Sequence, residues 1–218
     1  MNFNYKNTSL KRYIQIIELA LNEGYDFVFF DTNMNLTETR PKIYLRKDID
    51  FNPDLTLRLA DIDSKYGIKS SYFVRVNAPN YNFLAYKTLK VLKKLIEMGN
   101  EVHLHLDVSM ITNQNNSLEE LIKYQKQIYK IGMGTESRGV SLHTPSSLES
   151  PNESISQISK HFEFNTYSDK FFKEIKYVSD SGGNFNYDQP ENVIKDRTNF
   201  QLLIHPIWYY DQSPSENW

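Results

Sequence analysis

Short apolar segments typical of β-strands alternate along this chain with longer segments that have the periodicity of helices. The expected strands are residues 27–30, 43–49, 69–76, 101–107, 139–143, 177–179 and 200–205. The expected helices are residues 8–23, 53–67, 83–98, 117–131, 152–162 and 168–175. Strands that alternate with helices pair in parallel through right-handed crossovers. The pattern therefore predicts an α/β fold, a distorted (β/α) barrel with about seven strands, and an open doubly wound sheet is the alternative.

The chain of 218 residues is long enough for one domain with a core and a pocket. No repeat, long linker or composition break divides it, so we expect a single domain over residues 1–218. Most of the predicted strands are followed by polar loops, at 77–82, 108–116, 144–151 and 181–198. These loops are expected to help surround a pocket at the carboxyl ends of the strands.

Charge and composition exclude several classes of protein. The net charge of −2 gives no electrostatic reason to expect nucleic acid or a membrane surface as a partner. The absence of cysteine rules out disulfides and thiolate metal sites. The N-terminus shows no apolar run with a cleavage site, and no apolar stretch reaches membrane-spanning length. We therefore expect a cytoplasmic protein without membrane insertion, whose oligomeric state the sequence does not indicate.

Three charged residues share one face of the second predicted strand. Side chains alternate with period two in a strand, so Arg46, Asp48 and Asp50 project to the same side. Two carboxylates on one face repel each other unless a cation compensates, and a divalent ion or Arg46 can do so. The structural alternative is that Asp50 caps the following helix, although Asn52 already offers a cap.

The same period applies to the strand 101–107, where His103, His105 and Asp107 fall on one face and leucines and valine on the other. Such a strand is a credible source of metal ligands, or else a half-buried strand with a polar face toward solvent. Three more polar residues, His143, Asp180 and His205, each lie at the end of a predicted strand. Each is weak evidence alone, but their shared position indicates one site.

These segments, in this order, resemble the polysaccharide deacetylase family (carbohydrate esterase family four), and more closely its deacetylase-like branch with an R-H-D-V-D first motif. Asp48 and Asp50 match the aspartate pair of the first motif, and residues 99–105 match the glycine-to-histidine second motif, with His105 at the first ligand position. Residues 142–145 match the third motif loosely, Asp180 is the candidate for the fourth, and residues 203–205 match the L-x-H of the fifth.

The resemblance implies a metal-dependent hydrolase that removes an acyl group, N-acetyl by preference, from an amino sugar or related carbohydrate in surface-polysaccharide biosynthesis. By this resemblance Asp48 is the catalytic base, His205 the general acid, Asp180 the residue that tunes a catalytic group, and Asp50 and His105 metal ligands. The implied cofactor is a divalent metal ion, with zinc preferred, although cobalt, nickel, manganese and iron suit the same ligands. Arg46, His103 and Asp107 are assigned to substrate binding.

The sequence departs from the family pattern at three positions. Ser109 stands where a second metal histidine is expected, so either His143 or Asp107 must supply the third ligand, and His143 is preferred because imidazole suits zinc-like ions. His143 and Thr144 replace the arginine of the third motif, and His103 stands at a common glycine position. The alternatives left open are an O-acetyl esterase, a hydrolase of a non-sugar amide, a catalytically inactive carbohydrate-binding barrel, and a binding protein without metal.

Overall fold

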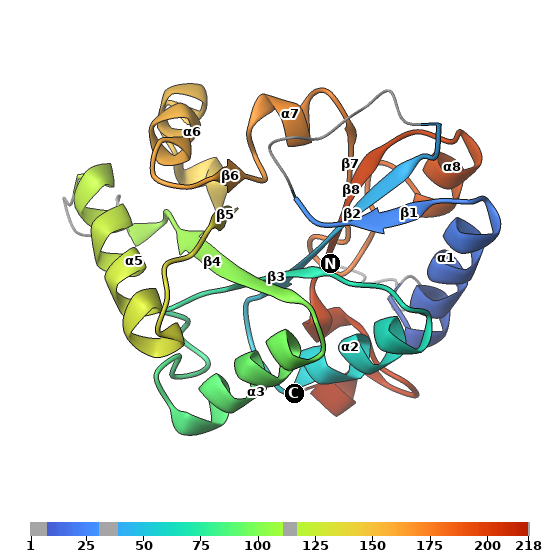
Figure 1. Cartoon of the computed structure of the whole chain (residues 1–218), viewed down its shortest axis with the longest axis horizontal. Helices are drawn as coiled ribbons and strands as arrows, with labels where there is room; N and C mark the ends of the chain where they lie inside the picture. Colours follow the sequence, from blue (N-terminus) through green and yellow to red (C-terminus); the bar gives the residue numbers. More distant parts are fainter. Residues whose placement is uncertain (1–7, 31–38, 111–116, 218) are drawn as a thin grey trace.

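The chain folds into one parallel sheet that curls into an open barrel, with helices around its outer face (Figure 1). This computed structural model describes residues 8–30, 39–110 and 117–217. The strands are β1 (Asp26–Val28), β2 (Lys42–Ile49), β3 (Ser71–Val74), β4 (Glu101–Asp107), β5 (Gly139–His143), β6 (Phe164–Asn165), β7 (Lys176–Ser179) and β8 (Phe200–Ile204). The α-helices are α1 (Leu10–Asn22), α2 (Leu55–Lys65), α3 (Tyr86–Glu97), α5 (Leu118–Met133), α6 (Pro151–Ser159), α7 (Asp169–Phe172) and α8 (Pro190–Lys195), and the 3-10 turns are η2 (Pro145–Ser147), η3 (Pro206–Trp208) and η4 (Pro214–Asn217).

The strand order is β6-β5-β4-β3-β2-β8-β7, and every pair is parallel. β1 extends the sheet beside the first residues of β2. β6 and β7 form the two ends of the sheet, and Gln201 of β8 reaches across the opening to donate hydrogen bonds to the carbonyls of Thr166 and Phe171. The predicted distorted barrel of about seven strands is confirmed.

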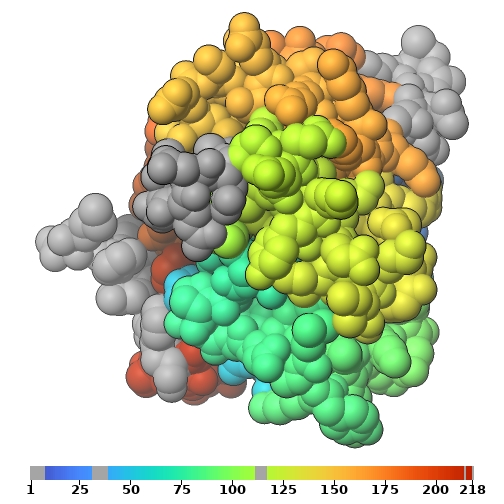
Figure 2. All heavy atoms as spheres, turned by 90° about the vertical axis from the view of Figure 1, so that its left-hand side faces the viewer, coloured from blue at the N-terminus to red at the C-terminus, as the bar shows by residue number. Residues whose placement is uncertain are grey.

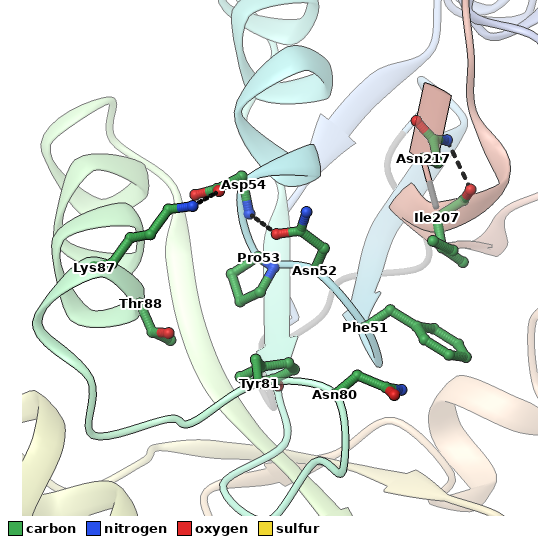
Figure 3. Close-up of a pocket in the computed structure, with 10 residues that line it drawn as sticks. All are labelled: Phe51, Asn52, Pro53, Asp54, Asn80, Tyr81, Lys87, Thr88, Ile207 and Asn217. Atoms are coloured by element: carbon green, nitrogen blue, oxygen red, sulfur yellow. Dashed lines mark hydrogen bonds and ion pairs between the residues drawn. The ribbon is translucent and has the colours of Figure 1, made fainter. Parts of the chain in front are cut away.

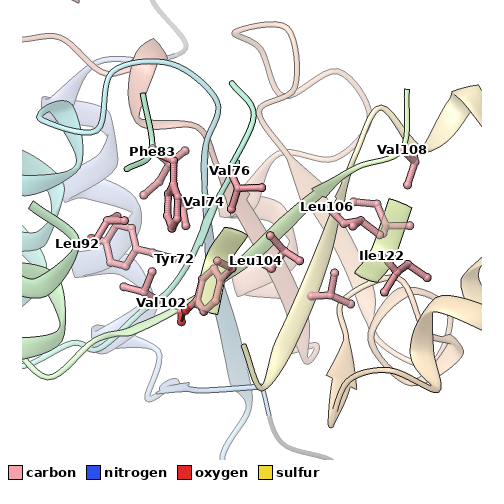
Figure 4. Close-up of a cluster of buried hydrophobic side chains, with 14 of the residues drawn as sticks. Tyr72, Val74, Val76, Phe83, Leu92, Val102, Leu104, Leu106, Val108 and Ile122 are labelled. Atoms are coloured by element: carbon pink, nitrogen blue, oxygen red, sulfur yellow. Dashed lines mark hydrogen bonds between the residues drawn. The ribbon is translucent and has the colours of Figure 1, made fainter. Parts of the chain in front are cut away.

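Three apolar clusters hold the barrel together. The first lies between β3–β5 and the helices α2, α3, α5 and α6, and Figure 4 shows its strand residues, such as Val74, Leu104 and Leu106. The segments of α3 and α5 lie side by side on that face of the molecule (Figure 2). The second cluster packs α1, α2 and α8 against β2 and β8. The third is aromatic and fills one end of the barrel interior, where Phe30, Phe73, Phe164 and Phe171 meet.

The predicted alternation of side chains is confirmed in the two strands on which the site depends. In β4, Val102, Leu104 and Leu106 join the outer apolar cluster, whereas His103 and His105 point to the interior. In β2, outward Leu45 alternates with interior Arg46 and Asp48. The polar side chains of both strands therefore share the inside of the barrel.

The sequence expectation was wrong for part of one loop. Residues 181–198 were expected to be a loop, but α8 occupies Pro190–Lys195 and buries Val193 and Ile194 against α1. Its proline at the first helical position is a helix-start signal that the short length obscured. The two-residue strand β6 was also not predicted. Residues 111–116 of the predicted loop 108–116, and the N-terminal residues that bear on a leader segment, lie outside the described residues.

Among the described residues, no helix is both long and apolar enough to cross a membrane.

The helix predicted from Ser117 does begin with a capping box, in which Ser117 and Glu120 exchange hydrogen bonds. The helix expected to open at Pro53 begins two residues later, at Leu55, after a turn. These local features follow from the residues at the ends of the elements.

Replacing Gly139 with alanine is expected to lower the free energy of unfolding by about 1–3 kcal/mol. An added Cβ would lie inside van der Waals contact with the ring of Phe164 on the adjacent strand β6. Urea unfolding of the variant measures the loss. The double variant Gly139→Ala, Phe164→Leu should recover part of it, and equal losses in both proteins would contradict this account of the packing.

Candidate active site

Six predicted site residues lie together at the carboxyl ends of the strands. They come from five different strands or the residues that directly follow them. They are Asp48 of β2, Asp50 directly after β2, His105 of β4, His143 of β5, Asp180 after β7 and His205 after β8. This edge is where parallel α/β barrels place their functional groups.

Asp50, His105 and His143 form a group that could hold a metal ion, with one ligand atom from each lying within 4.8 Å of the others. Asp50 Oδ1 is 3.2 Å from His105 Nε2 and 3.2 Å from His143 Nδ1. This oxygen is buried, yet among the described residues it has no hydrogen-bond partner of acceptable geometry. Two ligands bound at about 2.0 Å by one tetrahedral ion lie roughly 3.3 Å apart, so the donor set fits such an ion.

Ser141 fixes the orientation of His105. Its hydroxyl lies 2.5 Å from His105 Nδ1, which leaves Nε2 facing the two aspartates. A hydrogen bond to the nitrogen that faces away is the usual way in which a protein orients a ligating imidazole. Burial raises the pKa of Asp50, but the neighbouring imidazoles of His105 and His143 lower it overall, so this carboxylate stays charged.

Asp48 is held by a fully buried arginine. Arg46 Nε and Nη2 donate to the two carboxylate oxygens of Asp48 at 2.9 and 2.7 Å. Gln201 accepts from Arg46 Nη1 at 3.2 Å, and the ring of Tyr167 lies over the guanidinium. Burial raises the pKa of Asp48, yet the charge of Arg46 lowers it below its ordinary value. Asp48 is therefore a fixed, charged carboxylate, and its Oδ2 lies 3.4 Å from His105 Nε2.

Asp180 and His205 form a dyad beside the metal-ligand group. Asp180 Oδ1 lies 2.6 Å from His205 Nδ1, and the backbone N–H of His205 donates to Asp180 Oδ2 at 2.9 Å. His205 Nε2 then faces Asp50 Oδ2 at 3.6 Å. Burial lowers the pKa of His205, but Asp180, followed by Asp50 and Asp48, raises it overall to about 9. The imidazole is thus positioned to hold a proton that it can donate into the site.

The exposure of these side chains shows where a substrate can approach. The side chains of Asp50, His143 and His205 are 11%, 21% and 11% exposed, whereas those of Asp48 and His105 are each 2% exposed. Two candidate ligands, Asp50 and His143, and the candidate acid His205 are therefore partly exposed, whereas the ligand His105 and the candidate base Asp48 are buried.

The residues assigned to substrate binding are buried and are engaged with other side chains. Arg46 is occupied by Asp48, and His103 packs at the aromatic end of the interior between Phe73 and Phe164. Asp107, the alternative third ligand, accepts hydrogen bonds from Arg75 at 2.5 Å and from the Ser109 hydroxyl at 2.6 Å. The structure brings His143, not Asp107, into the group with Asp50 and His105. Direct contact of Arg46, His103 and Asp107 with substrate stays a prediction.

Three supporting residues were not identified from the sequence, namely Ser141, Gln201 and Arg75. Ser141 is two residues before His143 on β5, and Gln201 is four residues before His205, so the alternation of strand side chains places each on the same face as its histidine. Extending the period-two rule inward from each candidate histidine would have found both. Arg75 directly follows β3, and the sequence analysis assigned no candidate site residue to that strand.

Neither a family profile nor a curated protein sequence matches the chain. Several solved structures do match the chain. Peptidoglycan deacetylase PdaC from Bacillus subtilis is 21% identical with a TM-score of 0.50, covering 80% of this chain and 78% of that one. The chitin deacetylase from the fungus Colletotrichum lindemuthianum is 13% identical with a TM-score of 0.51, covering 75% of this chain and 73% of that one. The peptidoglycan N-acetylglucosamine deacetylase Bc1960 is 13% identical with a TM-score of 0.51, covering 75% and 71%.

The chain therefore has the fold of the polysaccharide deacetylases, and the predicted resemblance is confirmed at the level of the fold. At identities this low the likeness concerns the fold alone. What the protein does must be argued from its own residues.

Proposed function

We propose that this protein is a metal-dependent carbohydrate deacetylase that hydrolyses an N-acetyl group on an amino sugar. The observation that supports the proposal best is the single cluster of a buried, fixed carboxylate, a three-residue metal-ligand group and a histidine–aspartate dyad. Hydrolysis of an unactivated amide needs a base, an electrophile and an acid, and this cluster offers a group for each role. The fold of known deacetylases supports the same reaction class.

Each residue of the cluster has a distinct role in this proposal. Asp50, His105 and His143 would hold a divalent ion, zinc by preference, which would supply Lewis acidity for an acyl carbonyl and for water. Asp48, kept charged by Arg46, accepts the proton of the attacking water. His205, kept protonated by Asp180, donates a proton to the leaving amine. Ser141 keeps the Nε2 of His105 turned toward the aspartates.

The biological setting belongs to the same proposal and rests on the sequence resemblance. The substrate would be an N-acetylated sugar of surface-polysaccharide biosynthesis, and the protein would act in the cytoplasm. An O-acetyl ester is the alternative bond, because the same three roles serve ester hydrolysis.

The first experiment is the metal content of the purified protein, compared with the double variant Asp50→Ala, His105→Ala. We expect about one divalent ion per chain in the natural sequence and loss of the ion in the variant. The matched control is the double variant Asp169→Ala, His161→Ala, which removes the same residue types from positions outside the site and should keep the ion. If neither the natural sequence nor the control variant binds zinc, cobalt or manganese, the proposed mechanism is wrong.

Acetate release completes the test. The substrates are N-acetylglucosamine, its tetramer and an O-acetylated sugar, each with and without a chelator. Chelation should abolish release from the N-acetylated substrates, and added zinc should restore it. Release from the O-acetyl ester alone would establish the esterase. Metal and sugar binding without any release would establish the inactive carbohydrate-binding barrel.

A further inference from the structure

The first turn of α3 has no capping side chain. The residue at its N-cap is Ala85, which has no side-chain oxygen, whereas Ser117 caps α5 with its hydroxyl. Among the described residues, no acceptor is found for the backbone N–H groups of residues 86–88. The positive end of the α3 dipole and three donor groups are therefore available to an anion at this point of the fold.

This end of α3 faces a cavity of about 450 Å³ beside the candidate active site (Figure 3). The cavity is lined by residues 51–54, Asn80, Tyr81, Lys87, Thr88, Ile207 and Asn217. Residue 51 directly follows the candidate ligand Asp50, and residue 207 is two residues beyond His205. A ligand group in this cavity would thus adjoin the part of the substrate that lies in the candidate active site.

Thr88 is an independent sign that the cavity binds a polar group. Its side chain projects from α3 toward Pro53 and Tyr81 (Figure 3), and the residue is only 7% exposed. No hydrogen bond of its hydroxyl is found among the described residues. Thr56, the buried threonine in the first turn of α2, instead donates to the carbonyl of Pro53 at 2.6 Å. The Thr88 hydroxyl is therefore free to donate to a ligand, and a buried hydroxyl favours such a partner.

Lysines give this end of the groove between α2 and α3 a positive charge. Lys87 pairs with Asp54, but their side chains are 79% and 37% exposed, and exposed pairs of this kind contribute little. Lys87 can therefore turn toward an anion, while the Asp54 carboxylate opposes one. The cavity continues into a second hollow lined by four lysines, at 87, 90, 93 and 94, against Asp54 and Glu97. The excess of positive charge should attract anionic ligands to the end of α3.

These donors together suit a phosphoryl group. Backbone N–H groups at a helix N-terminus, a threonine hydroxyl and a lysine ammonium are the groups with which proteins commonly bind phosphate oxygens. In a 2-acetamido sugar the acetamido group and the anomeric oxygen are on neighbouring carbons, so a phosphoryl group on that oxygen lies next to the acetyl group. A cavity next to the candidate active site is therefore in the right place for it.

We propose that this cavity binds a phosphoryl group attached to the sugar whose acetyl group is removed, with Thr88, Lys87 and the first-turn N–H groups of α3 as the donors. This inference rests on the proposed function and deepens it, because it makes the substrate a phosphorylated sugar and not a neutral one.

The test compares kcat/KM for N-acetylglucosamine, its 1-phosphate and its UDP derivative, using zinc-supplemented protein. The natural sequence should prefer at least one phosphorylated sugar to N-acetylglucosamine by about tenfold or more, the usual effect of charge-assisted hydrogen bonds. The larger ratio shows whether the phosphoryl group is a monoester or part of a nucleotide diphosphate. Equal values for all three sugars would overturn the proposal.

Three variants test the residues. Thr88→Val keeps the shape without the hydroxyl, and it should lower the preference about tenfold, as should Lys87→Gln at an exposed position. Asp54→Asn should raise the preference by about two- to fivefold, because it removes the opposing charge and releases Lys87. The matched control is Lys173→Gln, an exposed lysine that also pairs with an aspartate, and it should keep the natural preference. An unchanged preference in all three cavity variants would contradict the assignment.

Calorimetric titration with glucose 1-phosphate, which carries the phosphoryl group but no acetyl group, separates this proposal from the proposed function. Weaker binding in Thr88→Val and Lys87→Gln, without acetate release from any sugar, would support the phosphoryl site and contradict the deacetylase. Acetate release without a preference for either phosphorylated sugar, together with equal glucose 1-phosphate binding in all proteins, would support the deacetylase and contradict the phosphoryl site.

Discussion

His205→Ala is expected to lower kcat by roughly 10²- to 10⁴-fold, the usual contribution of a positioned general acid, while the metal content is retained. The reason is geometric. His205 Nδ1 is held by Asp180 at 2.6 Å, so Nε2 is turned into the site, 3.6 Å from Asp50 Oδ2. Acetate release and metal content, measured on the same preparation, check both parts. The control is His161→Ala, which removes an imidazole that pairs with Glu119 away from the site.

The role of His205 as the acid can also be tested by the pH dependence of kcat/KM in the variant Asp180→Asn. Asp180 raises the pKa of His205, so removal of its charge should lower that pKa. A general acid works only while it is protonated, and the alkaline limb of the kcat/KM profile should therefore move to lower pH. The amide of asparagine keeps a similar shape, so the fold should survive. Natural activity in His205→Ala, or an alkaline limb that does not move in Asp180→Asn, would remove His205 from the role of acid.

Much of the fold could be predicted from the sequence because its elements are delimited by local chemistry. The boundaries of Glu101–Asp107 and Gly139–His143 agree with the structure, because glycine and polar residues flank an alternating run in each case. α8 was missed because its six residues carry too little periodicity to separate from a loop. The closure of the sheet, in which Gln201 spans the opening, depends on residues far apart in the chain and leaves no local signal.

The sequence predicted which side of the sheet the candidate site residues occupy better than it predicted their partners. Period-two alternation and strand-end position are properties of single strands, and they placed Asp48, Asp50, His105 and His143 correctly on one side. Ion pairs between side chains of different strands, in contrast, depend on the assembled barrel. Alternation within β2 already indicated that Arg46 could compensate the charge of Asp48, but the sequence could not indicate that Arg75 would pair with Asp107. That second pairing needs the register between β3 and β4, which the structure supplies.

Lys47, the residue between Arg46 and Asp48, is the basis of the second large expected effect. Alternation turns it to the outer face of β2, where it is fully buried and paired with Asp63 of α2. The Tyr13 hydroxyl donates to Asp63 Oδ1 at 2.5 Å, and the Ser70 hydroxyl to Oδ2 at 2.7 Å. Burial lowers the pKa of Lys47, and Asp63 opposes this change. One buried ion pair thus joins α1, α2 and β2 directly behind the candidate site.

Lys47→Met is expected to lower the free energy of unfolding by about 3–5 kcal/mol, because it leaves the Asp63 carboxylate buried without a cation. Urea unfolding measures the loss, with Lys173→Met as the control. Lys173 pairs with Asp169 on the surface, where loss of a pair costs about 1 kcal/mol or less. The double variant Lys47→Met, Asp63→Leu removes both charges and should be more stable than Lys47→Met alone, since the dominant penalty is the unpaired charge and not the missing attraction. A double variant less stable than the single one would show instead that the hydroxyls of Tyr13 and Ser70 depend on Asp63 more than Asp63 depends on Lys47.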